Sequence, residues 1–147
     1  GTTGGVAEAV VRHCMPDKSR NTLRALEYSP LRGNDSIREA TVQVGDREIH
    51  LAVVHGLIHA QELLKEIDAG NAYYDLIEVM TCPGGCVGGA GQPYGLKQKK
   101  QDRTAGLYAA DRSAPFKRAE YNPVVTSMMD AYTPDQRHDL LHVDYTK

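Results

Sequence analysis

The sequence of 147 residues has few cysteines, no excess of basic residues and no long apolar run. An odd number of cysteines, three, argues against a disulfide framework and fits a reducing compartment or a cluster site. A net charge of −2 gives no electrostatic case for binding nucleic acid. No segment approaches the roughly 20 apolar residues that a membrane helix needs, and the first residues do not resemble a signal peptide. We therefore expect a cytoplasmic globular protein with no nucleic-acid or membrane partner.

The most informative segment is EVMTCPGGCVGGAGQP, residues 78–93, which holds two cysteines and the densest cluster of glycines. Because it follows an apolar, strand-like run, we expect a loop at the edge of an α/β sheet. Gly84 and Gly85 are expected to take positive φ there. The spacing of Cys82 and Cys86 is compatible with iron–sulfur ligation, a disulfide or a structural loop. A zinc ribbon is excluded, because its paired C-x-x-C knuckles are absent.

The rest of the chain predicts alternating helices and strands. A strand, a helix and a second strand joined by short connections indicate parallel pairing, so the fold class is α/β, with a partly parallel sheet flanked by helices and a β-hairpin. The expected elements are a helix from Thr3 to Pro16, a short helix at 19–26, hairpin strands at 41–44 and 48–54, a helix at 57–67 capped by Gly70, a strand at 74–80, and helices at 103–112, 124–132 and 134–142.

Several side chains allow more than one interpretation. Cys14 shares a helix face with Val6 and Val10, which predicts a buried core residue; the alternative is a third cluster ligand. His55 and His59 are four residues apart, and we expect a hydrogen-bonded or exposed pair rather than a metal site. The basic run at 97–103 predicts a solvated loop or helix start, with a docking patch for an acidic electron carrier as the alternative.

The complete string from Glu78 to Pro93 resembles the third cysteine signature of the [FeFe]-hydrogenases, the iron-only hydrogenases, which reads roughly E-V-M-A-C-P-G-G-C-x-x-G-G-G-Q-P. Thr81, Gly88 and Ala90 are small replacements that leave the sulfurs in register. TGGVAEA, residues 3–9, resembles the family's T-G-G-V-M-E-A helix start, and shorter segments extend the resemblance over nearly the whole chain.

This resemblance implies that residues 1–147 are one lobe, the C-terminal part of the catalytic domain, and that an upstream lobe with the two other cysteine signatures is missing. It implies an H-cluster, a [4Fe–4S] cubane joined to a di-iron subcluster. Cys82 would bind the cubane and Cys86 would bridge the two parts. Met80 and Val6 would line the pocket, while Gly84 and Gly85 would let the loop wrap around the cluster.

The implied activity is the reversible reduction of protons to H2, with no catalytic side chain assigned to this chain. A cubane takes four protein ligands and this loop offers two, so we expect the isolated chain to be inactive, without a stable cluster, and prone to self-association. The implied partners are the upstream lobe and a ferredoxin-like or NAD(H)-linked electron carrier. The alternative is a non-catalytic, hydrogenase-like iron–sulfur protein for assembly or sensing, or a structural fragment without a cluster. The upstream cysteine signatures would distinguish the enzyme from the non-catalytic protein.

Overall fold

The computed structural model describes residues 1–16, 31–32, 35–89, 91–95 and 97–143. The chain forms two compact units, residues 1–114 and residues 115–147. The short helix predicted at 19–26 lies outside the described residues. Among the described residues, no helix is long and apolar enough to cross a membrane.

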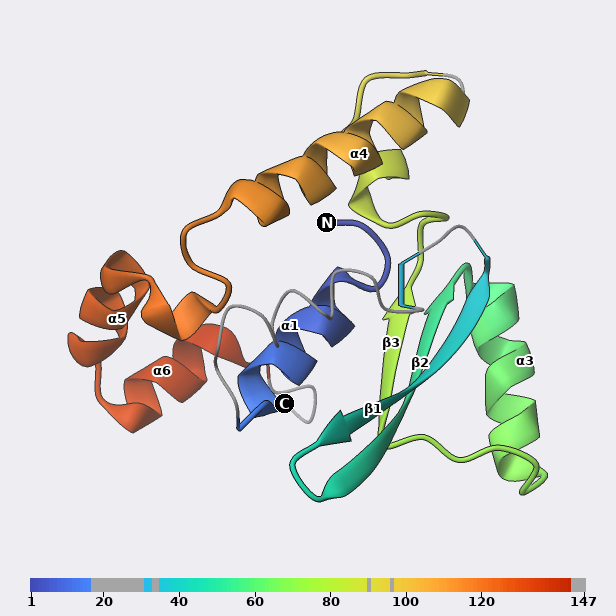
Figure 1. The fold of residues 1–147 in the computed structure, drawn as a ribbon, viewed down its shortest axis with the longest axis horizontal. Coiled ribbons are helices and arrows are strands. Elements are labelled where there is room, and N and C mark those ends of the chain that lie inside the picture. The colour runs from blue at the N-terminus through green and yellow to red at the C-terminus, as the bar shows by residue number, and fades with distance from the viewer. Residues whose placement is uncertain (17–30, 33–34, 90, 96, 144–147) are drawn as a thin grey trace. The chain divides into compact units, whose positions relative to one another are not determined.

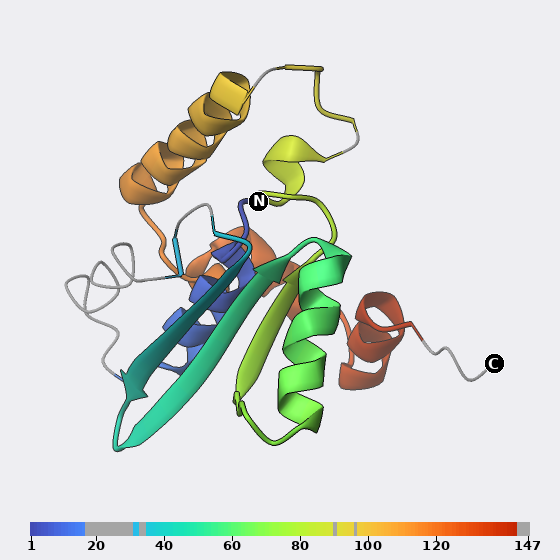
Figure 2. The same cartoon turned by 90° about the vertical axis from the view of Figure 1, so that its right-hand side faces the viewer.

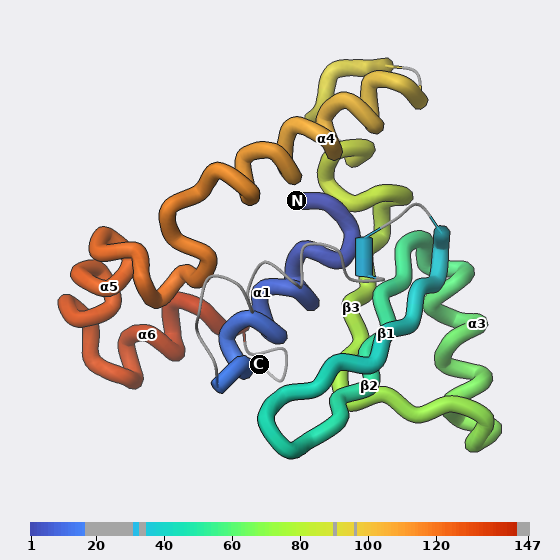
Figure 3. Tube along the Cα trace, viewed as in Figure 1, coloured from blue at the N-terminus to red at the C-terminus, as the bar shows by residue number. Residues whose placement is uncertain are grey.

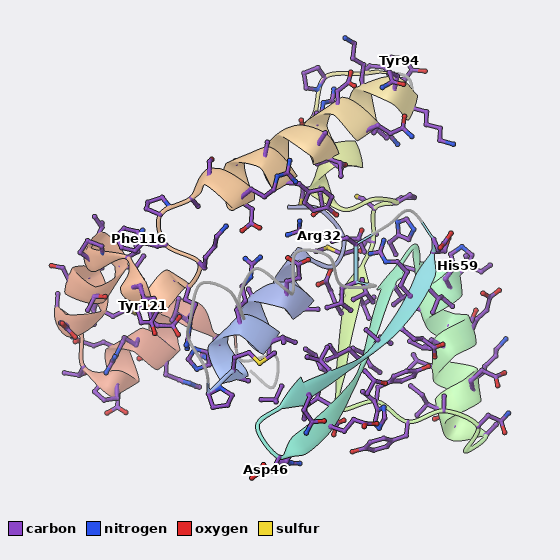
Figure 4. All side chains as sticks on the ribbon, in the orientation of Figure 1. Arg32, Asp46, His59, Tyr94, Phe116 and Tyr121 are labelled. Carbon is purple, nitrogen blue, oxygen red and sulfur yellow. The ribbon has the colours of Figure 1, made fainter. Side chains whose placement is uncertain are left out.

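A three-stranded sheet forms the centre of the first unit (Figure 1). Strands β1 (Ile37–Val44) and β2 (Arg47–His55) form the predicted antiparallel hairpin, which turns at Gly45 and Asp46; Figure 4 labels Asp46 at its tip. Strand β3 (Leu76–Met80) pairs with β2 in parallel, so the predicted parallel unit is confirmed.

Strand β1 begins four residues earlier than the sequence predicted. Its first half carries charged side chains that do not look like a strand entering a core, but long-range contacts accommodate them. Arg38 is 7% exposed and donates a hydrogen bond to the carbonyl oxygen of Thr3, 3.1 Å away. The carboxylate of Glu39 accepts a hydrogen bond from the hydroxyl of Tyr74. The sequence pattern does not reveal these partners, because they lie 35 residues away.

Strand β2 is apolar over its second half because both of its faces are covered. Helix α1 (Gly5–Cys14) lies on one face and helix α3 (Leu57–Asp68) on the other, as Figures 1 and 2 show. Leu51 and Val53 pack in the core beneath α1, and Ala52 and Val54 pack in the core beneath α3. Gly70, at φ 75°, follows α3 as predicted. The predicted α/β fold is therefore confirmed.

The prediction for the buried face of α1 is wrong. Val6 is 56% exposed, Val10 is 39% exposed and Cys14 is exposed, whereas Ala7 and Val11 are buried. The helix carries two adjacent apolar stripes, and the one with the small Ala7 side chain packs on the sheet. Cys14 is therefore not a core residue in this structure.

The start of α1 also differs from the prediction. Its N-cap residue is Gly4 rather than Thr3, and no side chain at that position caps the helix. The capping acceptor is instead the carboxylate of Glu78, on β3.

The C-terminal helices follow their local signals. Helix α4 (Lys97–Ser113) contains no buried residue. It begins six residues before the predicted helix at 103–112, because the basic run at 97–103 is its helix start and not a loop. In the second unit, a 3₁₀ turn, η3 (Ala119–Tyr121), precedes helices α5 (Pro123–Asp130) and α6 (Pro134–Leu141), whose path Figure 3 traces. Asn122 caps α5 and Thr133 forms a capping box on α6. In each helix a proline follows the capping residue at the first helical position, an arrangement typical of helix starts.

Candidate functional site

The two cysteines of the glycine-rich segment lie where the sequence placed them, beyond the carboxyl end of β3. We call residues 81–89 the cysteine loop. It begins directly after Met80, which pairs with His55 at the end of β2. The amide of Gly56 donates to the Met80 carbonyl oxygen, 2.8 Å away, and closes this edge of the sheet. The loop therefore starts at the carboxyl end of β3, beside the carboxyl end of the parallel strand β2. This edge of a sheet is a common location for ligand sites in α/β proteins.

The loop turns sharply at two consecutive glycines. Gly84 and Gly85 have φ of 85° and 84°, a conformation that other residues rarely adopt, as predicted. The amide of Gly85 donates to the Cys82 carbonyl oxygen at 2.9 Å, and Cys86 opens a short 3₁₀ turn, η2 (Cys86–Gly88). A Cβ atom at Gly85 would lie 2.7 Å from the Thr3 nitrogen, so only glycine fits there.

The start of the chain holds the other side of the loop through backbone contacts. The amide of Cys86 donates to the Gly1 carbonyl oxygen at 2.8 Å, and the amide of Thr3 donates to the Gly84 carbonyl oxygen at 3.2 Å. Thr2 and Gly85 form an isolated antiparallel bridge. The loop and the segment leading into α1 therefore form one packed unit.

A buried carboxylate fixes the start of α1 beside the loop. Glu78 is 7% exposed, and its two oxygens accept hydrogen bonds from the amides of Gly4, at 2.6 Å, and Ala7, at 2.7 Å. A negative charge at a helix N-terminus satisfies free amides and complements the helix dipole. Glu78 is therefore a structural partner of backbone groups. Since Glu78 lies on β3, two residues before Met80, it ties α1 to the strand that carries the loop.

Three of the predicted site residues line one cavity of about 350 Å³. Val6 comes from α1, Met80 from the end of β3 and Cys86 from the loop. The exposed side chain of Val6, which contradicts its predicted place in a core stripe, is explained by this cavity. Cys86 is exposed, whereas Cys82 is half-buried, and a Cβ atom at Gly89 would lie 3.2 Å from its sulfur.

One side of this cavity is a charged cluster that the sequence did not predict. Arg12 and Arg32 each contact Glu8, from α1, and Asp111, from α4, with separations of 2.6 to 3.3 Å; Figure 4 labels Arg32. The hydrogen bond that Arg32 donates to the Glu8 carboxylate raises the pKa of Arg32, whose guanidinium also lies 4.3 Å from the ring centroid of Tyr108. Only the spacing of Glu8 and Arg12, four residues apart on a helix, could have indicated part of this cluster from sequence.

The two candidate histidines do not form a metal pair. His55 is 7% exposed, and its Nδ1 accepts a hydrogen bond from the amide of Gly84, inside the cysteine loop. His59 is half-exposed at the start of α3, with Nδ1 3.1 Å from Glu62 (Figure 4). No three His, Cys, Asp or Glu side chains in the described parts of the chain gather into a metal-ion site.

These features define an α/β unit that presents two thiols and a glycine-rich turn beside a partly apolar cavity. Comparison with known proteins identifies the class. Residues 1–90 match the family model of the iron-only hydrogenase large subunit, C-terminal domain, and residues 97–147 match that of the iron hydrogenase small subunit. The chain therefore belongs to the iron-only hydrogenase family.

Individual relatives agree with this assignment. The chain is 40% identical over 153 residues to the NADP-reducing hydrogenase subunit HndD of Solidesulfovibrio fructosivorans, covering 100% of this chain and 26% of that protein. It is 40% identical over 111 residues to the periplasmic [Fe] hydrogenase large subunit of Nitratidesulfovibrio vulgaris, covering 74% of this chain and 26% of the relative. A solved [FeFe]-hydrogenase from Chlamydomonas reinhardtii matches 99% of this chain and 45% of its own, with TM-score 0.69 and 29% identity. The chain thus spans about a quarter of these two sequence relatives.

Proposed function

We propose that residues 1–147 form one C-terminal lobe of a hydrogenase catalytic subunit, and that the complete protein reversibly reduces protons to H2. The observation that carries this proposal is the cavity lined together by Val6, Met80 and Cys86 in a chain of the iron-only hydrogenase family. Helix α1, far away in sequence, and the adjoining end of β3 and cysteine loop bring an apolar side chain, a thioether and a thiol to one place. The isolated lobe is expected to be inactive.

The residues present fit part of an H-cluster site. Cys82 and Cys86 supply two thiolates, the usual ligands of iron–sulfur clusters, whereas a cubane takes four ligands. The tight turn at Gly84 and Gly85 brings backbone close to the cysteines without side chains in between. We assign the remaining ligands to an upstream lobe. When bound, the cluster supplies the redox chemistry, while this chain holds it and excludes water.

The surroundings of the two cysteines support different roles for them. Cys86 faces the cavity shared with Met80 and Val6, which suits a thiolate bridging the cubane and the di-iron subcluster. Cys82 lies against Gly89, at the half-buried base of the loop, which suits a ligand of the cubane alone. The thioether of Met80 and the methyl groups of Val6 would form an apolar, polarisable wall.

We propose that the upstream lobe covers this cavity, and that the isolated chain self-associates when the lobe is missing. Exposed Val6 and Cys86 at the cavity mouth support this, because apolar groups around a pocket favour burial. We also propose a ferredoxin-like or NAD(H)-linked electron carrier, supported by the name of the NADP-reducing relative. The three free cysteines support a reducing, cytoplasmic location, which cell fractionation of the native host would test.

The decisive experiment uses the complete reading frame, expressed with hydrogenase maturation proteins under anaerobic conditions. The matured protein should evolve H2, and Cys86→Ser should abolish both H2 evolution and the infrared bands of CO and cyanide on iron. Oxygen is a harder and weaker donor than thiolate for this role. Cys14→Ser is the matched control, because Cys14 is exposed on α1 and does not line the cavity, so activity should remain. Parental activity in Cys86→Ser would refute the assignment.

A second candidate is a non-catalytic iron–sulfur protein for cluster assembly. The chain is 28% identical over 149 residues to the cytosolic Fe-S cluster assembly factor narfl of Xenopus tropicalis, covering 99% of this chain. The higher identity to hydrogenase subunits, 40%, favours the enzyme. A complete protein that binds iron and sulfide, yet shows no diatomic-ligand infrared bands and no H2 evolution after maturation, would establish the assembly class instead.

A further inference from the structure

We propose that His55 is a positioning residue for the cysteine loop. Its Nδ1 accepts the hydrogen bond of the Gly84 amide and so sets the backbone between Cys82 and Cys86. The link to a cofactor rests on the function proposed above, but the contact itself and its test do not.

The backbone of Gly84 has more conformational freedom than that of other residue types. Its φ of 85° lies in a region that glycine enters at no steric cost, so the residue by itself does not select one conformation. A Cβ atom there would meet no atom closer than 3.8 Å, so no neighbour crowds the Cα of Gly84 on that side. Hydrogen bonds must therefore determine its backbone angles.

Three contacts hold the two peptide planes that flank Gly84, and one of them is the bond from the Gly85 amide, in the peptide to Gly85, to the Cys82 carbonyl oxygen at 2.9 Å. Its amide belongs to the peptide from Pro83, and it donates to His55 Nδ1. Its carbonyl belongs to the peptide to Gly85, and it accepts from the Thr3 amide at 3.2 Å. Because φ and ψ describe rotation between these two planes, fixing both planes fixes the angles of Gly84. The Thr3 contact is backbone to backbone, whereas the His55 contact depends on a side chain and can be removed by substitution.

His55 is itself firmly held. It is the last residue of β2, it is 7% exposed, and its amide donates to the Ser36 carbonyl oxygen at 2.9 Å. In the parallel register it lies opposite Met80, the residue from which the loop departs. The imidazole therefore holds the middle of the loop at a fixed position relative to the edge of the sheet.

The ring acts from outside the proposed cofactor pocket. His55 lines a separate cavity of about 240 Å³ with Pro83, Gly84 and Val87, and it does not line the cavity of Cys86 and Met80. It is thus a positioning residue and not a ligand. To accept from Gly84, Nδ1 must keep its lone pair, so a neutral His55 carries its proton on Nε2.

The test compares His55→Asn, whose amide oxygen can occupy the place of Nδ1, with His55→Phe, which keeps a ring but has no acceptor. His59→Phe is the matched control, because His59 contacts Glu62 and not the loop. In the complete protein, purified without cofactor, hydrogen exchange at the Gly84 amide should become about tenfold faster in His55→Phe. It should stay within about twofold of the parent in His55→Asn and His59→Phe. Unchanged exchange in His55→Phe would overturn the proposal.

A measurement without substitution covers the case in which His55→Phe fails to fold. Nitrogen-15 NMR of histidine-labelled parent protein, with the His55 signals assigned through His55→Asn, should show the neutral tautomer protonated at Nε2. A proton on Nδ1 would refute the proposed contact, because that nitrogen could no longer accept. Since neither experiment uses the cluster, a failure of the proposed hydrogenase activity would leave both results interpretable.

Discussion

Different interactions stabilise two regions of the molecule. The first, the sheet region, consists of α1 and residues 35–89, and the second consists of the helices in residues 97–143. In the first region Leu51, Val53 and Val54 are at most 1% exposed, and two cores lie on the two faces of one sheet. In the second region α4, α5 and α6 contain no buried residue, and apolar side chains such as Val124 and Leu140 are about two-thirds exposed, at 66% and 65%.

This difference shows that long-range packing determines one region, whereas local capping groups and polar contacts determine the other. The sheet region depends on long-range packing, because an apolar strand such as β2 is stable only when both faces are covered. The short helices α5 and α6 depend on local capping groups. Helix α4 contacts the rest of the first unit through polar groups such as Arg103, which donates to the Val87 carbonyl oxygen at 3.0 Å. The two regions also correspond to different family models. The large-subunit model matches residues 1–90 and the small-subunit model matches residues 97–147.

The largest effect should come from emptying the core of the sheet region. Leu51→Ala, at a side chain 1% exposed, should lower the free energy of unfolding by about 3 kcal/mol through lost burial and a new cavity. Leu140→Ala is the matched change in the C-terminal helices, where the side chain is 65% exposed, and should cost less than about 0.5 kcal/mol. Urea unfolding of the two variants would measure the difference, and similar losses would contradict the contrast between the regions.

The next effect concerns the carboxylate that joins β3 to α1. Glu78→Gln should lower stability by about 2 kcal/mol, because it removes a buried charge that accepts hydrogen bonds from two helix amides. Glu48→Gln, at an exposed side chain on β2, is the control and should have little effect. Amide exchange of Gly4 and Ala7 would locate the loss. Protection equal to the parent would show that the cap does not hold the helix.

A smaller effect should follow from loosening α4. Asp111→Asn should cost about 1.5 kcal/mol, because Arg12 and Arg32 each lose a charge-assisted partner while keeping Glu8. Faster amide exchange along α4 would accompany it. Asp102→Asn, on the exposed side of the same helix, should change neither quantity. Because Asp111 is 27% exposed, the difference in free energy of unfolding between parent and Asp111→Asn should shrink in 1 M salt. A difference that does not depend on salt would contradict an ionic origin.

The smallest effect should be local to the second unit. Thr133→Ala removes the capping box of α6 and should destabilise that helix by about 1 kcal/mol. Amide exchange should increase in α6 but stay unchanged in β2. Thr133→Ser keeps the hydroxyl acceptor and should restore most of the protection. Exchange that rises equally in β2 would show that the two regions do not behave separately.

The sequence predicted those parts of the fold whose signals are local or periodic. The hairpin turn at Gly45, the glycine after α3, and the caps at Asn122 and Thr133 were all recognisable from neighbouring residues. The sequence failed where a partner lies far along the chain. Glu78 caps a helix 74 residues earlier, and Asp111 pairs with an arginine 99 residues earlier. Nothing near either residue in sequence identifies such a partner.

The sequence by itself determined the α/β elements, the family resemblance, and the loop in which two glycines bring Cys82 and Cys86 to the end of a strand. Only the tertiary structure decided that Val6 points out of the core and that His55 holds the loop from outside the cavity of Met80 and Cys86. The physical reason is that the two apolar stripes of α1 are nearly equivalent in sequence. Packing on the sheet and the cap from Glu78 select the stripe that faces inward, and this rotation exposes Val6 to the cavity.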